Sequence, residues 1–306
     1  MSSKEGVISA NLIMITRANF LPLTVVIVSA GLAASFYAHR VFQTPDALLV
    51  LLGALLTHAS VNAFNNYFDY RSKIDERTTK TPFSGGVDVL VKGRMKPSLA
   101  LGVSVTTFLA AAVIGLYFLS RMFYPLLPLL VYGGLIIVLY TPVLSKIHGL
   151  SEVIAGSGFG LMGLGAYVTQ SGLIDAPGIT VFVPVTILVA LLLFLNEFPD
   201  AEVDRIAGRR HLVILLGRRR ASWVYVAGLA ATYCSIILAV GLKAGPLTIL
   251  LSLFSVPIAY RAGRIVLRNY DRTPELIPAL GFNVITILST ILLIAVGFLV
   301  AAFVHL

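Results

Sequence analysis

Nine apolar runs divide this chain, and each is long enough to cross a lipid bilayer as a helix. A membrane-spanning helix needs about 20 residues to match the thickness of the hydrocarbon core. With 58% apolar and 12% charged residues among 306, the chain is too hydrophobic for an ordinary soluble domain. The runs lie at about 18–38, 46–68, 98–119, 123–142, 150–170, 179–198, 221–241, 245–261 and 277–304. We predict an all-α polytopic membrane protein with nine transmembrane helices, forming one domain over residues 1–306.

This arrangement sorts the basic residues to one side of the membrane. Of the 23 Lys and Arg residues, 20 fall in the N-terminal segment or in the loops after the second, fourth, sixth and eighth runs. Only Arg40, Arg121 and Lys243 fall on the other side. Because basic loops stay in the cytoplasm, we predict a multi-pass protein of the cell membrane with a cytoplasmic N-terminus. Basic residues divided among short loops form no compact nucleic-acid-binding module, so we expect no nucleic-acid partner.

Two acidic, amide-containing clusters follow the second and sixth runs, in the segments NNYFDYRSKID and NEFPDAEVD. In each cluster an Asn precedes an Asp by four residues, first as Asn65 and Asp69 and then as Asn196 and Asp200. That spacing puts both side chains on one helix face. Both clusters follow even-numbered runs, so we expect them at the same membrane face. Carboxylates at the end of a membrane helix are costly and mark functional sites.

Oxygen-rich clusters without Cys or paired His favour Mg2+ over zinc. The predicted metal ligands are Asn65, Asp69, Asp75, Asp200 and Asp204. Asn196 lies beside them and is predicted to contact substrate. Because Mg2+ usually completes its shell with water and substrate phosphate, the clusters predict a phosphorylated substrate. The interleaved basic residues Arg71, Lys73 and Arg205 are expected to bind its remaining charge.

The paired motifs, the nine runs and the YTP sequence at the end of the fourth run together resemble the UbiA superfamily of intramembrane prenyltransferases. The resemblance covers essentially the whole chain. It implies a helical bundle around a central cavity with a cytoplasmic cap, and two Mg2+ ions that bridge both motifs to an isoprenyl diphosphate. It also implies prenyl transfer to a hydrophobic, often aromatic acceptor. The catalytic residues expected on this basis are Asp69, Asp200, Lys73 and Tyr140.

The first motif departs from the DxxxD pattern of many members, because Lys73 occupies the position of the second Asp. Asp75 is instead the next acid, and a glycine pair, Gly85 and Gly86, follows. This pattern is similar to the branch that prenylates 1,4-dihydroxy-2-naphthoate in quinone synthesis. The stretch rich in Arg and Pro found in glyceryl phosphate prenyltransferases is absent, and archaeal lipid synthesis stays the alternative. A cation-coupled transporter is the alternative from another class.

Several polar residues near this face keep two interpretations. Lys146 is either a phosphate ligand or a helix-end anchor. Tyr140 either stabilises an allylic cation through its ring face or is an interfacial aromatic. Arg17 either binds an acceptor carboxylate or marks the cytoplasmic interface. His58 and Asn62 extend the polar stripe of the second run, and interhelical hydrogen bonding explains them.

Two other features are expected to be structural. Glycines between 156 and 165 give the fifth run small faces for close helix packing, and Cys234 is expected to pack inside the seventh run. A prenyl tail gains about 0.8 kcal/mol per buried CH2 and is already dissolved in the bilayer. We therefore expect a lateral gap between helices that opens to lipid.

Overall fold

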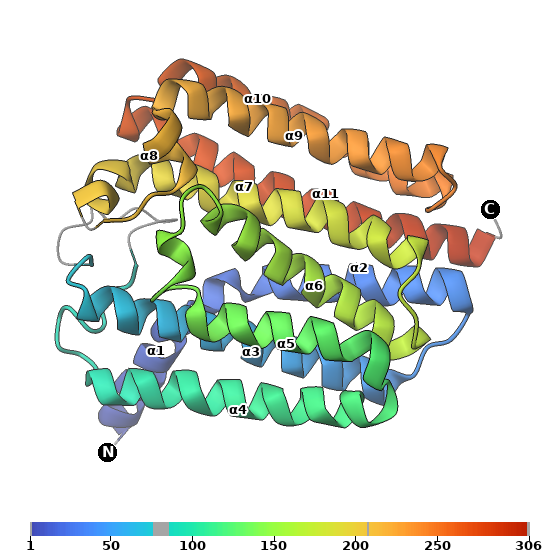
Figure 1. The fold of residues 1–306 in the computed structure, drawn as a ribbon, viewed down its shortest axis with the longest axis horizontal. Helices are drawn as coiled ribbons and strands as arrows, with labels where there is room; N and C mark the ends of the chain where they lie inside the picture. Colours follow the sequence, from blue (N-terminus) through green and yellow to red (C-terminus); the bar gives the residue numbers. More distant parts are fainter. Residues whose placement is uncertain (1, 76–85, 207, 305–306) are drawn as a thin grey trace.

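The computed structural model describes residues 2–75, 86–206 and 208–304, and within these ranges the chain is helical, with no β-strand. Figure 1 shows the long helices lying side by side, with α1 crossing obliquely at one end of the bundle. The α-helices are α1 Ser2–Ile15, α2 Leu21–His39, α3 Thr44–Arg71, α4 Pro97–Arg121, α5 Phe123–Leu139, α6 Ser151–Ser171, α7 Ala176–Ile206, α8 Leu212–Leu216, α9 Arg218–Gly241, α10 Val256–Asn269 and α11 Thr273–Val304. Short 3-10 helices lie at Ala18–Phe20, Leu144–Lys146 and Leu247–Ser255.

Seven helical segments in the described ranges are long and apolar enough to cross a membrane, fewer than the nine predicted. They are Ala18–His39, Thr44–Arg71, Pro97–Arg121, Ala176–Ile206, Arg218–Gly241, Leu247–Asn269 and Thr273–Val304. The two other predicted runs fall on α5 and α6. Helix α5 has only 17 residues and contains Pro128, whereas glycine, serine and glutamine lower the hydropathy of α6.

The eighth run differs most from its prediction. Residues Leu247–Ser255 form a 3-10 helix, and the α-helix begins only at Val256, with Pro257 in its first turn. Proline fits the first turn of an α-helix because its missing N–H has no partner there.

Cys234 is exposed on α9, so its predicted packing role is wrong. Helix α1 was not predicted, and Asn11 anchors it by donating from Nδ2 to the Arg94 carbonyl at 3.0 Å.

The glycines of α6 let that helix approach its neighbours closely, as predicted. A Cβ added at Gly156 or Gly160 would overlap Thr186 of α7. One added at Gly31 of α2 would overlap the backbone of Gly163. Because any side chain at these positions would force the helices apart, the glycines fix the distances of α6 from α7 and α2.

Helix α7 lies in the middle of the bundle and packs against α2, α6, α9 and α11. Its side chains Leu188, Leu195 and Phe198 are almost completely buried in the main apolar core. The helix continues through Pro199 to Ile206, so it carries the second acidic cluster on its last two turns. The packing of α7 on several sides therefore fixes the position of that cluster.

Candidate active site

The two acidic clusters lie in one cavity of about 280 Å³ at an end of the bundle. Asn65 and Asp69 reach it from α3, and Asn196, Asp200 and Asp204 reach it from α7. The prediction that both clusters share one face is therefore consistent with their positions. The wall farther from the clusters is apolar, and the residues that form much of it are Leu23, Ile136, Ile137, Phe159, Met162, Val189, Leu192 and Leu193.

Arg209 joins the two clusters directly. Its Nη2 donates to Asp69 Oδ1 at 2.6 Å, and its Nη1 donates to Asp204 Oδ1 at 3.2 Å. Burial opposes the charge of this guanidinium, but the carboxylates of Asp69 and Asp204 outweigh it and raise the pKa of Arg209 above its usual range. Arg209 therefore stays positively charged between the helix ends.

Asn65 is the amide of the first cluster that faces the cavity. Its Nδ2 donates to Asp69 Oδ2 at 3.1 Å and to Thr141 Oγ1 at 3.3 Å. Asn66 is nearly fully buried and donates instead to the Ile15 carbonyl, at 3.0 Å. The first amide is therefore in contact with the acids, whereas the second ties α3 to α1.

Arg17 also lines the cavity, and its predicted contact with substrate stays a prediction. Its Nη2 donates to Asn66 Oδ1 at 3.1 Å and to Asn65 Oδ1 at 3.4 Å. The residue has a φ of 49°, in the left-handed region, at the turn between α1 and α2. The guanidinium after this turn lies against the two amides of the first cluster.

The Asp75 carboxylate lines the cavity just beyond α3. Gly86, with a φ of 69°, lies so close to it that an added Cβ would overlap Asp75 Oδ1. Gly86 therefore both supplies the left-handed backbone and leaves room for the acid. Gly85, its neighbour in the predicted glycine pair, lies outside the described residues.

Four predicted phosphate-binding residues are exposed and do not line the cavity: Arg71, Lys73, Lys146 and Arg205. Arg71 donates to the Tyr67 hydroxyl at 3.1 Å, and Arg205 donates to Glu202 at 2.8 Å. The positions of Arg71 and Arg205 have a simple reason, because residues one or two places after an inward-facing Asp lie on a different side of the helix. Lys73 follows the helix end in a left-handed turn. Their predicted contacts with diphosphate stay predictions.

Tyr140 lines the cavity immediately after α5. Its neutral phenol offers a ring and a hydroxyl to the cavity.

The predicted interhelical hydrogen bonds of the polar stripe are present. Thr24 Oγ1 and His58 Nδ1 lie 2.7 Å apart, and Asn62 Nδ2 donates to the Thr16 carbonyl at 3.0 Å. Both His58 and Asn62 also line the cavity.

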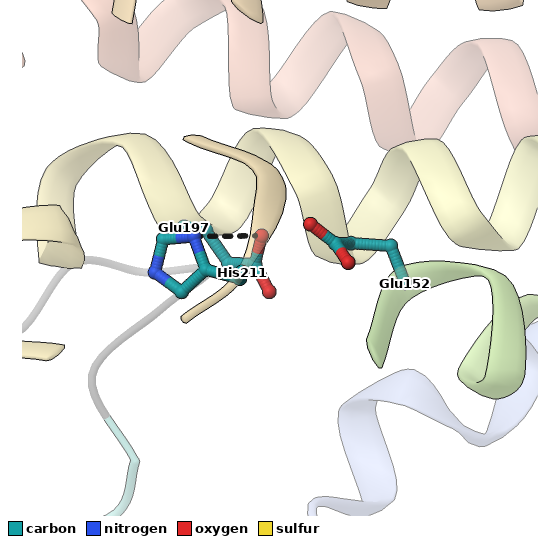
Figure 2. Close-up of side chains that lie close together, drawn as sticks. All are labelled: Glu152, Glu197 and His211. Atoms are coloured by element: carbon teal, nitrogen blue, oxygen red, sulfur yellow. Dashed lines mark ion pairs between the residues drawn. The ribbon is translucent and has the colours of Figure 1, made fainter. Parts of the chain in front are cut away.

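Sequence reasoning missed three ionisable side chains among the described lining residues, those of Arg209, Glu197 and His211. Glu197 follows Asn196 directly, and its position inside an acidic motif was an available signal. Arg209 and His211 lie beyond the end of α7, where helical spacing gives no guide to direction. Figure 2 shows Glu197 and His211 together with Glu152, which approaches from α6.

The cavity composition fits a divalent cation. Among its described lining residues, five carboxylates surround only two guanidinium groups, those of Arg17 and Arg209. The carboxylates belong to Asp69, Asp75, Glu197, Asp200 and Asp204. Carboxylate and amide oxygens are suitable Mg2+ ligands, so both the donor atoms and the excess negative charge suit this ion.

The fold and cavity define a membrane-embedded enzyme whose polar helix ends stand over an apolar chamber. Over residues 24–284 the sequence matches the UbiA prenyltransferase family, and the chain belongs to that family. It is therefore a prenyltransferase and a multi-pass integral membrane protein. This membership decides against the transporter alternative.

Individual relatives agree with this assignment. The chain is 27% identical over 232 residues to 1,4-dihydroxy-2-naphthoate octaprenyltransferase of Bacillus subtilis, covering 73% of this chain and 71% of the relative. A solved structure of digeranylgeranylglyceryl phosphate synthase matches with a TM-score of 0.67 and 18% identity, over 95% of this chain and 98% of that one. A UbiA homolog from Archaeoglobus fulgidus bound to GPP and Mg2+ matches with a TM-score of 0.62 and 16% identity, over 93% and 99%. These structural matches show the fold alone.

Proposed function

We propose that this protein transfers a prenyl group from an isoprenyl diphosphate to an aromatic quinone precursor within the membrane, releasing diphosphate. The observation that carries the proposal is the convergence of both acidic clusters on a single cavity with an apolar wall. The charged end suits a metal–diphosphate group, and the apolar wall suits a prenyl chain.

Two Mg2+ ions are the proposed cofactors, as implied by the UbiA resemblance and supported by the solved homolog bound to GPP and Mg2+. The residues proposed to hold them are Asn65, Asp69, Asp75, Asp200 and Asp204, with Asn196 as a substrate contact. When bound, Mg2+ supplies charge neutralisation to the diphosphate leaving group. In this proposal Arg209 and Arg17 supplement the ions, because they are the guanidinium groups among the described lining residues.

The chain's own side chains then control the reactive allylic group. Ile136, Phe159 and Leu192 exclude water from the chamber, which protects the developing allylic cation from hydrolysis. Tyr140 turns a neutral aromatic ring toward this chamber, and a ring face stabilises nearby positive charge. Catalysis in this scheme depends on positioning and electrostatics more than on a protein nucleophile.

The tail is proposed to leave the chamber between α2 and α11. A small groove of about 80 Å³ lies there, lined by Phe20 and Leu23 at the start of α2, by Leu192 of α7, and by Ile287 and Leu288 of α11. Phe20, Leu23 and Leu192 also line the main cavity. The shared residues make this groove the natural lateral route toward lipid.

The similarity to the Bacillus naphthoate enzyme supports a quinone precursor as acceptor. The fold match to digeranylgeranylglyceryl phosphate synthase keeps a glyceryl phosphate as the second candidate. Incubation of purified protein with Mg2+, labelled geranylgeranyl diphosphate and each acceptor tests this choice, with products identified by mass. A prenylated naphthoate supports the proposal, a prenylated glyceryl phosphate supports the alternative, and product from neither acceptor contradicts both assignments.

We further propose that residues 1–306 act as one domain with nine spans in the cell membrane, with the N-terminus and the cavity mouth cytoplasmic. Helices α5 and α6 supply the two spans beyond the seven that meet the length and hydropathy criteria. Single cysteines replacing exposed Lys92 and Glu202, in a Cys234→Ala background, should label only from the cytoplasmic side. A cysteine at exposed Lys243 should label only from outside, and the reverse pattern would contradict the orientation.

A further inference from the structure

A second group of metal-ligating side chains lies beside the acidic clusters, at the junction of three elements. Glu152 comes from the first turn of α6, Glu197 from α7, and His211 from the residue before α8. Figure 2 shows Glu152 directed toward Glu197, with the imidazole of His211 beyond it. One ligand atom from each residue lies within 4.8 Å of the others. Their exposures are only 2%, 8% and 2%, so water has little access to them.

Among the residues that the structure describes, none forms a hydrogen bond with either ring nitrogen of His211. Its Nδ1 lies 3.4 Å from Glu197 Oε2, and its Nε2 lies 3.3 Å from Asp204 Oδ2, but neither contact has hydrogen-bond geometry. Glu197 Oε2 likewise has no hydrogen-bond partner in the described parts of the chain. A buried polar group without a partner costs about 1–3 kcal/mol, so this group of side chains is incomplete as a purely structural network.

Glu152 is held in place from the opposite side. Its Oε1 accepts the Leu212 N–H at 2.7 Å, and its Oε2 accepts the Ser151 hydroxyl at 2.7 Å. These bonds explain why the Glu152 carboxylate, from α6, is buried against the start of α8. They do not involve His211, whose imidazole lies beside the two glutamates without a hydrogen bond to any described residue.

We propose that Glu152, Glu197 and His211 bind one divalent transition-metal ion of the Zn2+ or Mn2+ class, separate from the predicted Mg2+ sites. Two carboxylates and one imidazole are a ligand set that such ions accept, whereas Mg2+ prefers oxygen ligands and keeps several waters. Zinc–ligand bonds of about 2.0–2.2 Å require only small side-chain rotations from a group this compact.

The ion would act on the second acidic cluster through His211. With Nδ1 bound to metal, the neutral ring carries its proton on Nε2, which faces Asp204. A hydrogen bond from that nitrogen to Asp204 Oδ2 would orient the carboxylate. The other oxygen of this carboxylate, Oδ1, already accepts a hydrogen bond from Arg209. The proposed site is therefore a positioning element for a residue of the active cavity and goes beyond the proposed prenyl transfer.

Metal binding to the full-length protein tests the proposal without a turnover assay. Protein stripped with chelator is titrated with Co2+ in excess Mg2+, which occupies the oxygen-rich clusters. We expect one Co2+ per chain with visible absorption typical of a nitrogen- and oxygen-ligated site, displaced by Zn2+. Because even indirect partners of a metal site contribute 10–100-fold in affinity, His211→Gln should weaken Co2+ binding by about 100-fold or more.

Matched variants separate this site from its surroundings. Glu152→Gln keeps an oxygen to accept the Leu212 N–H and should also weaken Co2+ binding, whereas Glu202→Gln, on an exposed part of α7, should not. Asp69→Asn should leave the Co2+ stoichiometry unchanged. Wild-type protein that binds no Co2+ in the presence of Mg2+ would overturn the proposal. Binding that is insensitive to both His211→Gln and Glu152→Gln would do the same, and would leave a proton shared between the glutamates as the explanation of their proximity.

Discussion

The two ends of the bundle treat charge in opposite ways. At the end away from the cavity, Asp46 lies 2.6 Å from Arg121, and Asp175 lies 3.1 Å from His39. Each acid therefore faces a basic side chain, and the pairs join helices to one another. At the cavity end, five carboxylates share two guanidinium groups among the described lining residues. We call the far end balanced because these two acids are paired. We call the cavity end unbalanced because carboxylates outnumber guanidinium groups in its described lining, which suits a positively charged ligand.

The strongest test removes an acid from the unbalanced end. Asp69→Ala or Asp200→Ala should lower kcat/KM by roughly 10³-fold or more, because the leaving group loses its electrostatic stabilisation. Chelation of Mg2+ should have the same effect on the wild-type protein. Diphosphate release is the measurement, and Asp46→Ala at the balanced end is the matched control that should retain turnover per folded molecule. Near wild-type release by either cavity variant would contradict the two-cluster site.

A smaller effect is expected for the cation between the clusters. Arg209→Ala should reduce kcat/KM by about 100-fold, because a charge-assisted contact to both the acids and the diphosphate is lost. The KM for isoprenyl diphosphate should rise as well. Arg268→Ala, on an exposed face of α10, removes an equal charge far from the cavity lining and should change neither constant. Equal behaviour of the two variants would show that net charge, and not position, matters.

The apolar half of the cavity end can be tested through the lateral groove. Leu288→Trp should narrow the space between α11 and α2. It should reduce turnover of geranylgeranyl diphosphate about tenfold more than that of dimethylallyl diphosphate, because a long tail loses about 0.8 kcal/mol for each CH2 that is no longer buried. Leu292→Trp, exposed on the same helix outside the groove, is the control. An equal loss for short and long substrates would contradict a lateral exit for the tail.

The balanced end should affect stability without affecting chemistry. Among the described side chains, Arg121→Met leaves the Tyr117 hydroxyl, at 3.3 Å, as the remaining hydrogen-bond donor to the buried Asp46 carboxylate. We expect a decrease in Tm of a few degrees in detergent and unchanged kcat/KM at low temperature. A variant with unchanged Tm but reduced turnover would show that the two ends are not independent.

The periodicity of polar residues predicts much of this site, and local chain geometry explains what it misses. Asn65 with Asp69 and Asn196 with Asp200 follow helical spacing, so their shared faces were predictable. Arg209 lies beyond the end of α7, where spacing along the sequence no longer defines direction. Its backbone N–H donates to the Asp204 carbonyl at 2.9 Å, in a turn that returns the side chain to the cavity.

The fold was predictable to a similar degree. Hydropathy located the apolar segments because bilayer thickness sets their length, yet α1 was missed because its sequence lacks a sustained apolar run. Tertiary packing determines which basic side chains reach the cavity, and spacing along the sequence does not show this. The sequence therefore predicts four exposed basic residues in place of Arg209. The proximity of Glu152 and His211 also depends on tertiary packing. It brings the start of α6 next to the residue before α8, and no spacing along the sequence predicts that contact.

The contact between Asp69 and Arg209 has a consequence for how the protein is made. The two residues are separated by 140 positions, and ribosomes add about 5–20 residues per second. The first acidic cluster is thus synthesised on the order of ten seconds before its cation exists. During that interval Asp69 lacks the guanidinium that it later contacts, so the first half of the protein must hold this acid with the Asn65 amide and with Arg17, which lines the same cavity.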